Sequence, residues 1–240
     1  MSGFGDELAD LSAALRAVAE DAQVRGARDA DPQPWNALAV EDRDAPVEAA
    51  RRLEQVRLDL GDCQRCPLHR GRSQIVFGVG DPDADLVVCG EAPGYHEDQR
   101  GEPFVGPAGE MLDKMLRHVL GLERAEVYIL NIVKCRPPKN RNPLPAEIDA
   151  CMPFLQRQLQ SLSPKVVLVL GAVAYRSLLR VEQGIKRNRG RWHQLGDIPV
   201  MPTFHPAYLL RQPGDKRLTF EDLKDVRRRY DALGGKRKTG

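Results

Sequence analysis

The chain has 240 residues, of which 42% are hydrophobic and 29% are charged, a balance typical of water-soluble globular proteins. No apolar run approaches the roughly 18–20 residues of a membrane span, and no basic segment followed by an apolar one begins the chain, so we expect neither a membrane protein nor a secreted one. The expected location is the cytoplasm, where thiols stay reduced.

The net charge of +2 conceals an uneven distribution. Residues 1–62 hold 7 basic and 14 acidic residues, whereas residues 63–240 hold 29 basic and 20 acidic residues. The basic part suits a polyanion such as nucleic acid, although a solvated charged surface explains it equally well.

The first part of the chain, residues 1–50, is a predicted N-terminal extension. Apolar residues recur at helical spacing over residues 1–23, which predicts a helix, and the Ala-, Asp-, Arg- and Pro-rich residues 24–48 predict a flexible linker. A second helix is expected from about residue 47 to residue 60.

Strand-like and helix-like segments then alternate, in a predicted domain of residues 51–234 followed by a basic tail, residues 235–240. The alternation predicts a three-layer α/β/α fold with a four-stranded parallel sheet. Pro153 is expected to disturb one of the helices. The predicted strands span residues 85–89, 127–133, 165–170 and 199–204, and the predicted helices span residues 108–120, 145–162, 172–179 and 219–233.

Polar motifs follow several of these strands. GEAPG follows the first strand, Asn131 lies at the end of the second, and HPAYLL follows the fourth. Ligands of parallel sheets bind beyond the carboxyl ends of the strands, so we expect these motifs to converge on one pocket.

Five cysteines fall into two groups. Cys89 lies inside an apolar strand and is interpreted as a core residue. The other four suit either tetrahedral zinc or an iron–sulfur cluster, and a CxxC pair alone is also typical of redox sites. One pair and two distant single cysteines favour a [4Fe–4S] cluster, with zinc as the alternative. The four are Cys63, Cys66, Cys135 and Cys151.

The order of motifs resembles the family 4 uracil-DNA glycosylases, from about Cys63 to the C-terminal helix. The motifs are CxxC, GEAPG, EDxxGxPFVGPAG, NIVKCRPPKNRNP, Cys151 and FHPAYLLR. The resemblance implies a monofunctional enzyme that hydrolyses the N-glycosidic bond of deoxyuridine in DNA, leaves an abasic site and initiates base excision repair. It also implies that the four cysteines ligate a [4Fe–4S] cluster of mainly structural role.

The resemblance further implies how the base would be bound. Phe104 would stack on a flipped uracil, and Asn131 would bond its N3–H and O4. The backbone of Gly90 and Ala92 would bond O2, and Glu97 would lie near C5 and exclude the methyl group of thymine, a task that neighbouring side chains could share.

Two residues are the implied catalytic groups. Glu91 would position water or stabilise a cationic sugar, and His205 would donate a hydrogen bond to the leaving uracil. Family 1 enzymes carry an aspartate where this chain has Ala92, which leaves the role of Glu91 open. The loop after Asn131 contains no histidine, so we expect turnover and no covalent trapping on DNA.

DNA contacts are expected from the basic run IKRNRGR and from the HPAYLLR loop, with Lys139 and Arg141 on the same face. In the HPAYLLR loop, Tyr208, Leu209 and Leu210 would form a wedge that fills the gap left by the flipped base. The residues singled out are Lys186, Arg187, Arg189, Tyr208, Leu209 and Arg211.

Two rival functions remain open on the residues alone. One is a non-catalytic iron–sulfur protein that binds DNA or recruits a partner, and the other is a zinc-stabilised nucleic-acid-binding domain. We expect a monomer that acts on single- or double-stranded DNA. Its acidic extension would shield the basic face or bind a repair or replication protein.

Overall fold

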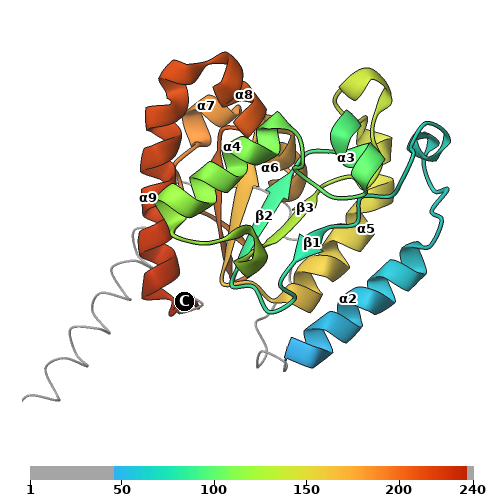
Figure 1. Cartoon of the computed structure of the whole chain (residues 1–240), viewed down its shortest axis with the longest axis horizontal. Helices are drawn as coiled ribbons and strands as arrows, with labels where there is room; N and C mark the ends of the chain where they lie inside the picture. Colours follow the sequence, from blue (N-terminus) through green and yellow to red (C-terminus); the bar gives the residue numbers. More distant parts are fainter. Residues whose placement is uncertain (1–45, 237–240) are drawn as a thin grey trace, which may run out of the picture. The chain divides into compact units, whose positions relative to one another are not determined.

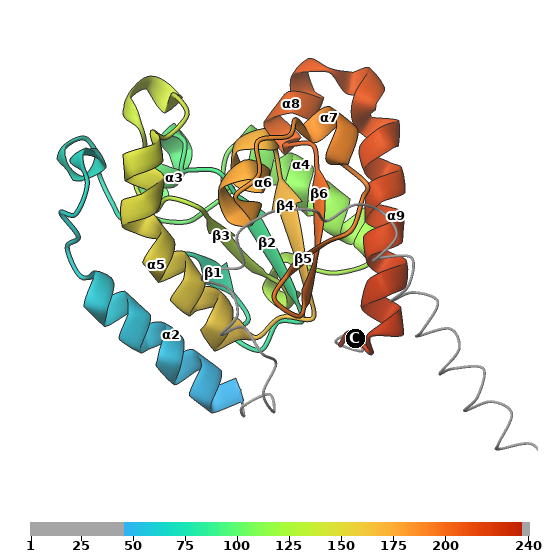
Figure 2. The same cartoon turned by 180° about the vertical axis from the view of Figure 1, so that it is seen from behind.

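The computed structural model describes residues 46–236. The predicted helix over residues 1–23, most of the predicted linker and the last four residues of the tail lie outside this range. In the described part, a six-stranded sheet carries helices on both faces, as Figures 1 and 2 show from opposite sides. The predicted three-layer α/β/α fold is confirmed.

The sheet has the strand order β1-β3-β2-β4-β6-β5. The four predicted strands form its parallel centre, and two edge strands that we did not predict pair antiparallel with it. The edge strands escaped prediction because one has two residues and the other is mostly polar. The strands are β1 (Val79–Gly80), β2 (Leu86–Gly90), β3 (Tyr128–Asn131), β4 (Val166–Leu170), β5 (His193–Leu195) and β6 (Ile198–Thr203).

The long helices match their predictions, and the unpredicted ones have six residues or fewer. The predicted helix over residues 108–120 passes into a π-helical turn at Leu116–Leu120. Contrary to expectation, Pro153 does not interrupt its helix. The helices are α2 (Pro46–Leu60), α3 (Tyr95–Arg100), α4 (Pro107–Met115), α5 (Pro145–Leu162), α6 (Ala172–Leu179), α7 (Ile185–Asn188), α8 (Pro206–Arg211) and α9 (Lys216–Ala232), with 3-10 turns at Pro67–Arg70, Arg124–Glu126, Pro138–Asn140 and Pro213–Asp215.

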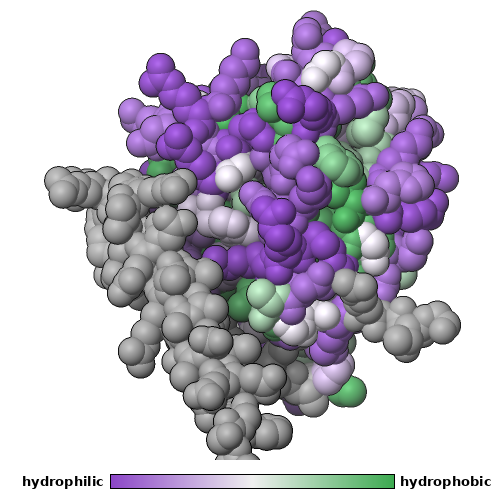
Figure 3. Space-filling view, turned by 90° about the vertical axis from the view of Figure 1, so that its left-hand side faces the viewer, coloured by the Kyte–Doolittle hydropathy of each residue, from purple (hydrophilic) through white to green (hydrophobic). Residues whose placement is uncertain are grey.

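Alternation along the strands builds two cores. In β2, Val87 and Cys89 face the first core, which α2, α5 and α6 cover, whereas Leu86 and Val88 face the second core, under α4, α8 and α9. The predicted core position of Cys89 is confirmed, because its side chain is fully buried. The flank that carries α9 is mostly hydrophilic where the described residues are visible, with apolar side chains in a narrow strip (Figure 3).

Strand register brings the polar motifs to one edge. Gly90 at the end of β2 pairs with Asn131 at the end of β3, and Leu170 at the end of β4 pairs with Thr203 at the end of β6. The segments that follow these strands therefore start side by side. Among residues 46–236, no helix is long and apolar enough to cross a bilayer.

Candidate active site and cysteine centre

Gly90, Asn131 and Phe104 meet at the end of the sheet. A Cβ added to Gly90 would lie 2.4 Å from Asn131 Oδ1 and 2.6 Å from Phe104 Cζ. Only a residue without a side chain fits here, because both neighbours are themselves buried. The three residues therefore lie together. The strand-end pattern predicted this for Gly90 and Asn131, whereas Phe104 was named only through the family resemblance.

The Asn131 side chain is buried and incompletely satisfied. Only 2% of the residue is exposed, and its Oδ1 has no hydrogen-bond donor among the described residues. A buried acceptor without a partner is costly, so such atoms are rare unless a ligand supplies the donor. This oxygen is therefore available to accept a hydrogen bond from a bound molecule.

Phe104 is held in a strained backbone conformation. Its φ of 55° lies in the left-handed region, which phenylalanine rarely adopts. The Glu97 carboxylate stabilises the loop by accepting hydrogen bonds from the N–H groups of Gly94, Val105 and Gly106, at 3.1, 3.0 and 3.2 Å. Glu97 thus joins the GEAPG loop to the Phe104 loop, a role that the motif match did not suggest.

His205 lies against Phe104 as a neutral imidazole. The ring centroids are 5.6 Å apart with planes 26° from parallel. Burial and, to a lesser extent, the Arg211 cation lower the pKa of His205 to about 4, whereas the Glu97 carboxylate acts in the opposite direction. His205 Nδ1 accepts from the Ala207 N–H at 3.1 Å, so the ring proton sits on Nε2, which is left as a hydrogen-bond donor.

Glu91 and Ala92 follow directly after β2. The carbonyl of Glu91 accepts from Val133 N–H at 3.2 Å, which continues the alignment of the two central strands. Burial raises the pKa of the half-buried Glu91 carboxyl, and the Arg176 cation opposes that shift. Ala92 packs against the first core. The carboxylate is thus a base more readily protonated than an exposed one.

The cations of the basic run divide into two kinds. Lys186 and Arg187 are exposed on α7. Arg189 instead forms an ion pair with the buried Asp222, with Nε 2.9 Å from Oδ2, and Thr203 Oγ1 donates to the same carboxylate at 2.6 Å. Arg189 therefore anchors its loop to α9, and Thr203 ties the same carboxylate to β6.

The HPAYLLR segment forms α8, and one of its predicted contacts is wrong. Leu209 is 1% exposed in the second core, so it is not available to DNA; the exposed neighbour is Leu210, at 43%. A single helical turn explains the difference, because adjacent residues point to different sides. Tyr208 donates to Asp215 at 2.5 Å, and Arg211 is exposed.

The four candidate ligand cysteines gather on the first core. Cys135 is buried in it, while Cys63, Cys66 and Cys151 pack against it half-buried. Burial raises the pKa of the Cys135 thiol, the Arg72 guanidinium opposes this shift, and the nearby Cys66 and Cys63 sulfurs add to it. Within residues 46–236, no three Cys, His, Asp or Glu side chains are grouped so as to hold a metal ion.

Two cations beside these sulfurs were missed. Arg72 donates from Nη1 to Cys135 Sγ at 3.2 Å and to the Cys63 carbonyl at 2.6 Å. Lys134 is 1% exposed, and its Nζ donates to the Asn131 carbonyl at 2.7 Å. A lysine that directly continues the apolar strand VYILNIV was a usable signal for Lys134, whereas nothing in the sequence marks Arg72.

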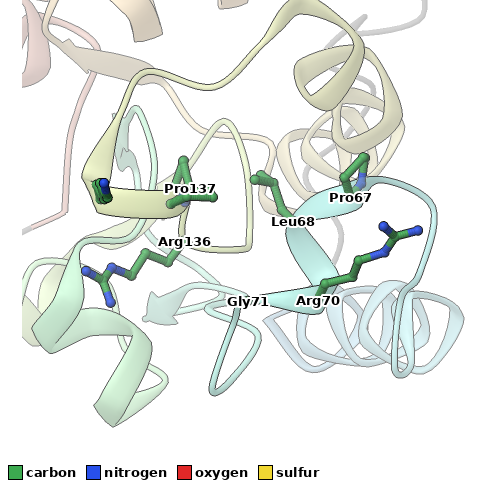
Figure 4. A pocket seen from close by; sticks show the side chains of 8 residues that line it. Pro67, Leu68, Arg70, Gly71, Arg136 and Pro137 are labelled. Atoms are coloured by element: carbon green, nitrogen blue, oxygen red, sulfur yellow. The ribbon is translucent and has the colours of Figure 1, made fainter.

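A cavity of about 400 Å³ lies between the loops that follow Cys66 and Cys135. Figure 4 shows Arg70 on one loop and Arg136 on the other. Lys139, which completes the cationic lining, is exposed. The cavity therefore offers positive charge beside the cysteine centre.

Known proteins are similar to this chain over most of its length. The uracil DNA glycosylase superfamily matches residues 77–226. A type-4 uracil-DNA glycosylase of Sulfurisphaera tokodaii is 39% identical over 78% of this chain and 93% of its own. The type-4 enzyme of Thermotoga maritima is 43% identical over 73% and 93%. A type-5 uracil-DNA glycosylase of Thermus thermophilus is 35% identical over 67% and 80%.

Proposed function

The chain belongs to the uracil-DNA glycosylase superfamily, with type-4 enzymes as its relatives, and from this premise we propose how its residues remove uracil from DNA. The enzyme is a monofunctional glycosylase that hydrolyses the N-glycosidic bond of deoxyuridine and leaves an abasic site. The observation that carries the assignment of the pocket is the buried, unpaired Oδ1 of Asn131 beside Phe104.

A base must leave the helix to reach this pocket. The Phe104 ring supplies a stacking surface, since every base has an aromatic face. Asn131 Oδ1 accepts the N3–H of uracil, and its Nδ2 donates to O4. Cytosine has no hydrogen on N3, so it would leave Oδ1 without a donor, which gives the pocket its selectivity.

His205 stabilises the leaving group. As the C1′–N1 bond breaks, the electron pair passes to uracil and negative charge builds on O2. The Nε2–H donor of a neutral imidazole, with the N–H groups of Gly90–Ala92, stabilises that charge without transferring a proton. Stabilisation by a preorganised donor is stronger in a buried site than in water.

Glu91 acts on the sugar side. Its carboxylate stabilises the cationic sugar and orients the water whose oxygen forms the new bond to C1′. The water proton passes through Glu91 to solvent, and the uracil anion takes a proton from solvent after release. The Arg176 cation favours the ionised form that this role needs.

The cysteine centre fits a [4Fe–4S] cluster held by Cys63, Cys66, Cys135 and Cys151. Cationic or N–H donors lie beside the sulfurs, as anionic thiolate ligands require. A four-iron cluster holds its thiolates farther apart than one zinc ion does, and the four sulfurs lie in or against the same core. Bound there, the cluster would cross-link two loops and helix α5, which carries Cys151.

The DNA backbone is expected to follow the exposed cations. Helices α7 and α8 carry the exposed Lys186, Arg187 and Arg211. The cavity lined by Arg70, Arg136 and Lys139 lies beside the cysteine loops. Arg189 acts through its anchoring of the loop. We also propose a cytoplasmic monomer whose acidic extension, residues 1–50, binds a repair or replication partner or shields the basic face.

Base selection by the full-length protein tests the function. Labelled oligonucleotides with one uracil, thymine or cytosine at the same position would be treated with enzyme and then alkali, as single strands and as duplexes. Cleavage only at uracil, with free uracil released, is expected. No cleavage by brown, iron-containing protein on either form would contradict the proposed function.

A further inference from the structure

Lys134 is a buried cation that the mechanism above does not use. Its side chain is among the largest that are fully buried, and its Nζ donates to the main-chain carbonyl of Asn131 at 2.7 Å. No carboxylate of the described residues forms an ion pair with it. A buried ammonium group without a counter-anion is strongly destabilising, so the fold must provide a negative charge nearby.

The neighbours of Lys134 identify that charge. Lys134 directly precedes the proposed ligand Cys135 in the chain. Burial lowers the pKa of its amine to about 8, and the sulfurs of Cys151, Cys89 and Cys135 oppose that shift. The main-chain N–H of Lys134 also donates toward the Cys151 sulfur. Cys151 and Cys135 are two of the four proposed ligands, and neutral thiols do not compensate a cation. Thiolates bound to iron do.

Lys134 therefore stands between two centres. Its ammonium donates to the backbone of Asn131, the uracil-reading residue, and its main chain continues directly into the proposed ligand Cys135. The main-chain carbonyl of Lys134 accepts from Val76 N–H at 2.8 Å, which fixes the segment that carries it. The hydrogen bond from the Lys134 ammonium to the Asn131 carbonyl therefore restricts the position of the Asn131 backbone.

We propose that Lys134 is a positioning residue that serves as the counter-charge of the thiolate-bound cluster and couples that cluster to Asn131. The proposal rests on the proposed function and on the proposed cluster. It explains why a lysine stands between an apolar strand and a ligand cysteine. Its consequence is that loss of the cluster releases the base-reading amide.

Three variants of the full-length protein, purified without oxygen, test the charge. Lys134→Met removes it at similar size, Lys134→Arg retains it, and Lys114→Met changes an exposed lysine on α4 as the matched control. Iron per chain and the rate of iron loss to a chelator are measured. Lys134→Met is expected to lose iron about 10- to 100-fold faster than wild type, with Lys134→Arg between them and Lys114→Met unchanged.

The coupling to Asn131 is tested on the same preparations. Single-turnover uracil release by iron-containing Lys134→Met is expected to fall about tenfold at saturating enzyme, with little change in DNA affinity. Wild-type iron retention and release rate in Lys134→Met would overturn the proposal. So would equal iron loss from Lys134→Met and Lys134→Arg, even if neither retains a cluster, because charge would then be irrelevant. Iron retention that follows charge in a protein unable to release uracil would refute only the proposed function.

Discussion

The side-chain oxygen of Asn131 lies where a side chain on Gly90 would stand. The two residues pair across β2 and β3, and a Cβ on Gly90 would come within 2.4 Å of Asn131 Oδ1. Because Gly90 has no side chain, the Asn131 amide and the Phe104 ring can meet above it. Any larger residue at position 90 would displace one or both of them.

Gly90→Ala is expected to reduce uracil release about 100-fold by displacing Asn131 and Phe104. Single-turnover kinetics on a uracil oligonucleotide measure the effect. Gly214→Ala is the matched control, because a Cβ there meets nothing within 4 Å. Equal loss in the two variants would show that the close approach does not matter.

Glu97 has two proposed roles, which are positioning of the Phe104 loop and exclusion of the C5 methyl group of thymine. If its carboxylate positions the Phe104 loop, Glu97→Gln loses one or two of its three backbone hydrogen bonds, because glutamine keeps a single acceptor oxygen, and uracil release falls about 10- to 100-fold, with no gain of thymine release. Paired assays on uracil and thymine oligonucleotides measure both. The exposed Glu102→Gln serves as the control. Thymine release by Glu97→Gln would instead support exclusion of the C5 methyl group.

His205 gives the fold a dependence on acid. Its folded pKa of about 4 lies below the ordinary 6.5, so between these values the unfolded chain binds the proton and the folded chain does not. Stability is complete above pH 6.5 and is lost as the pH falls toward 4, by about 2 kcal/mol at pH 5. Denaturant unfolding at pH 7 and 5 should show a smaller loss in His205→Gln than in wild type. Identical losses would contradict a neutral, buried imidazole.

Two adjacent leucines should behave differently. Leu209→Ala removes a core side chain and is expected to lower the free energy of unfolding by about 2–5 kcal/mol. Leu210→Ala should change stability by less than about 0.5 kcal/mol and slow uracil release from duplexes but not from single strands, where no gap needs filling. Denaturant unfolding and paired kinetics test both. A slower release from duplexes in Leu209→Ala, with a loss of stability in Leu210→Ala, would instead indicate that Leu209 fills the gap left by the flipped base.

The cations on and after α7 should have different roles, with Lys186 and Arg187 binding DNA and Arg189 stabilising the fold. Lys186→Ala with Arg187→Ala is expected to weaken binding to uracil-free DNA and to reduce the slope of log K against log salt by about 2. Arg189→Ala should instead destabilise the fold by about 3–5 kcal/mol, because Asp222 stays buried without its partner. Titrations at several salt concentrations and denaturant unfolding distinguish these outcomes. An unchanged slope in the double variant would remove α7 from the DNA path.

The sequence predicted the layers of the fold because apolar strands and amphipathic helices carry local periodicity. The four central strands and α5 follow from such patterns. The polar edge strand β5 and the six-residue α8 depend on tertiary pairing and packing, which periodicity does not encode. Leu209 was misplaced for that reason.

The sequence likewise predicted some residues of the site but not their contacts. Motif order placed Gly90, Phe104, Asn131 and His205 together, as the structure does. The contacts of Glu97 and Arg189 were out of reach, because a carboxylate that caps a loop and one that faces a ligand look alike in sequence. Arg72 reaches Cys135 across 63 positions, a contact set only by the fold.

The central claim is that Asn131, whose Oδ1 is unpaired, reads the base, and single-turnover uracil release by Asn131→Ala tests it most directly. The exposed Asn142→Ala is the matched control, and both would be assayed beside wild type on the same oligonucleotide with iron content measured. We predict a loss of about 100-fold or more for Asn131→Ala and none for Asn142→Ala. Wild-type release by an iron-containing Asn131→Ala would contradict the account.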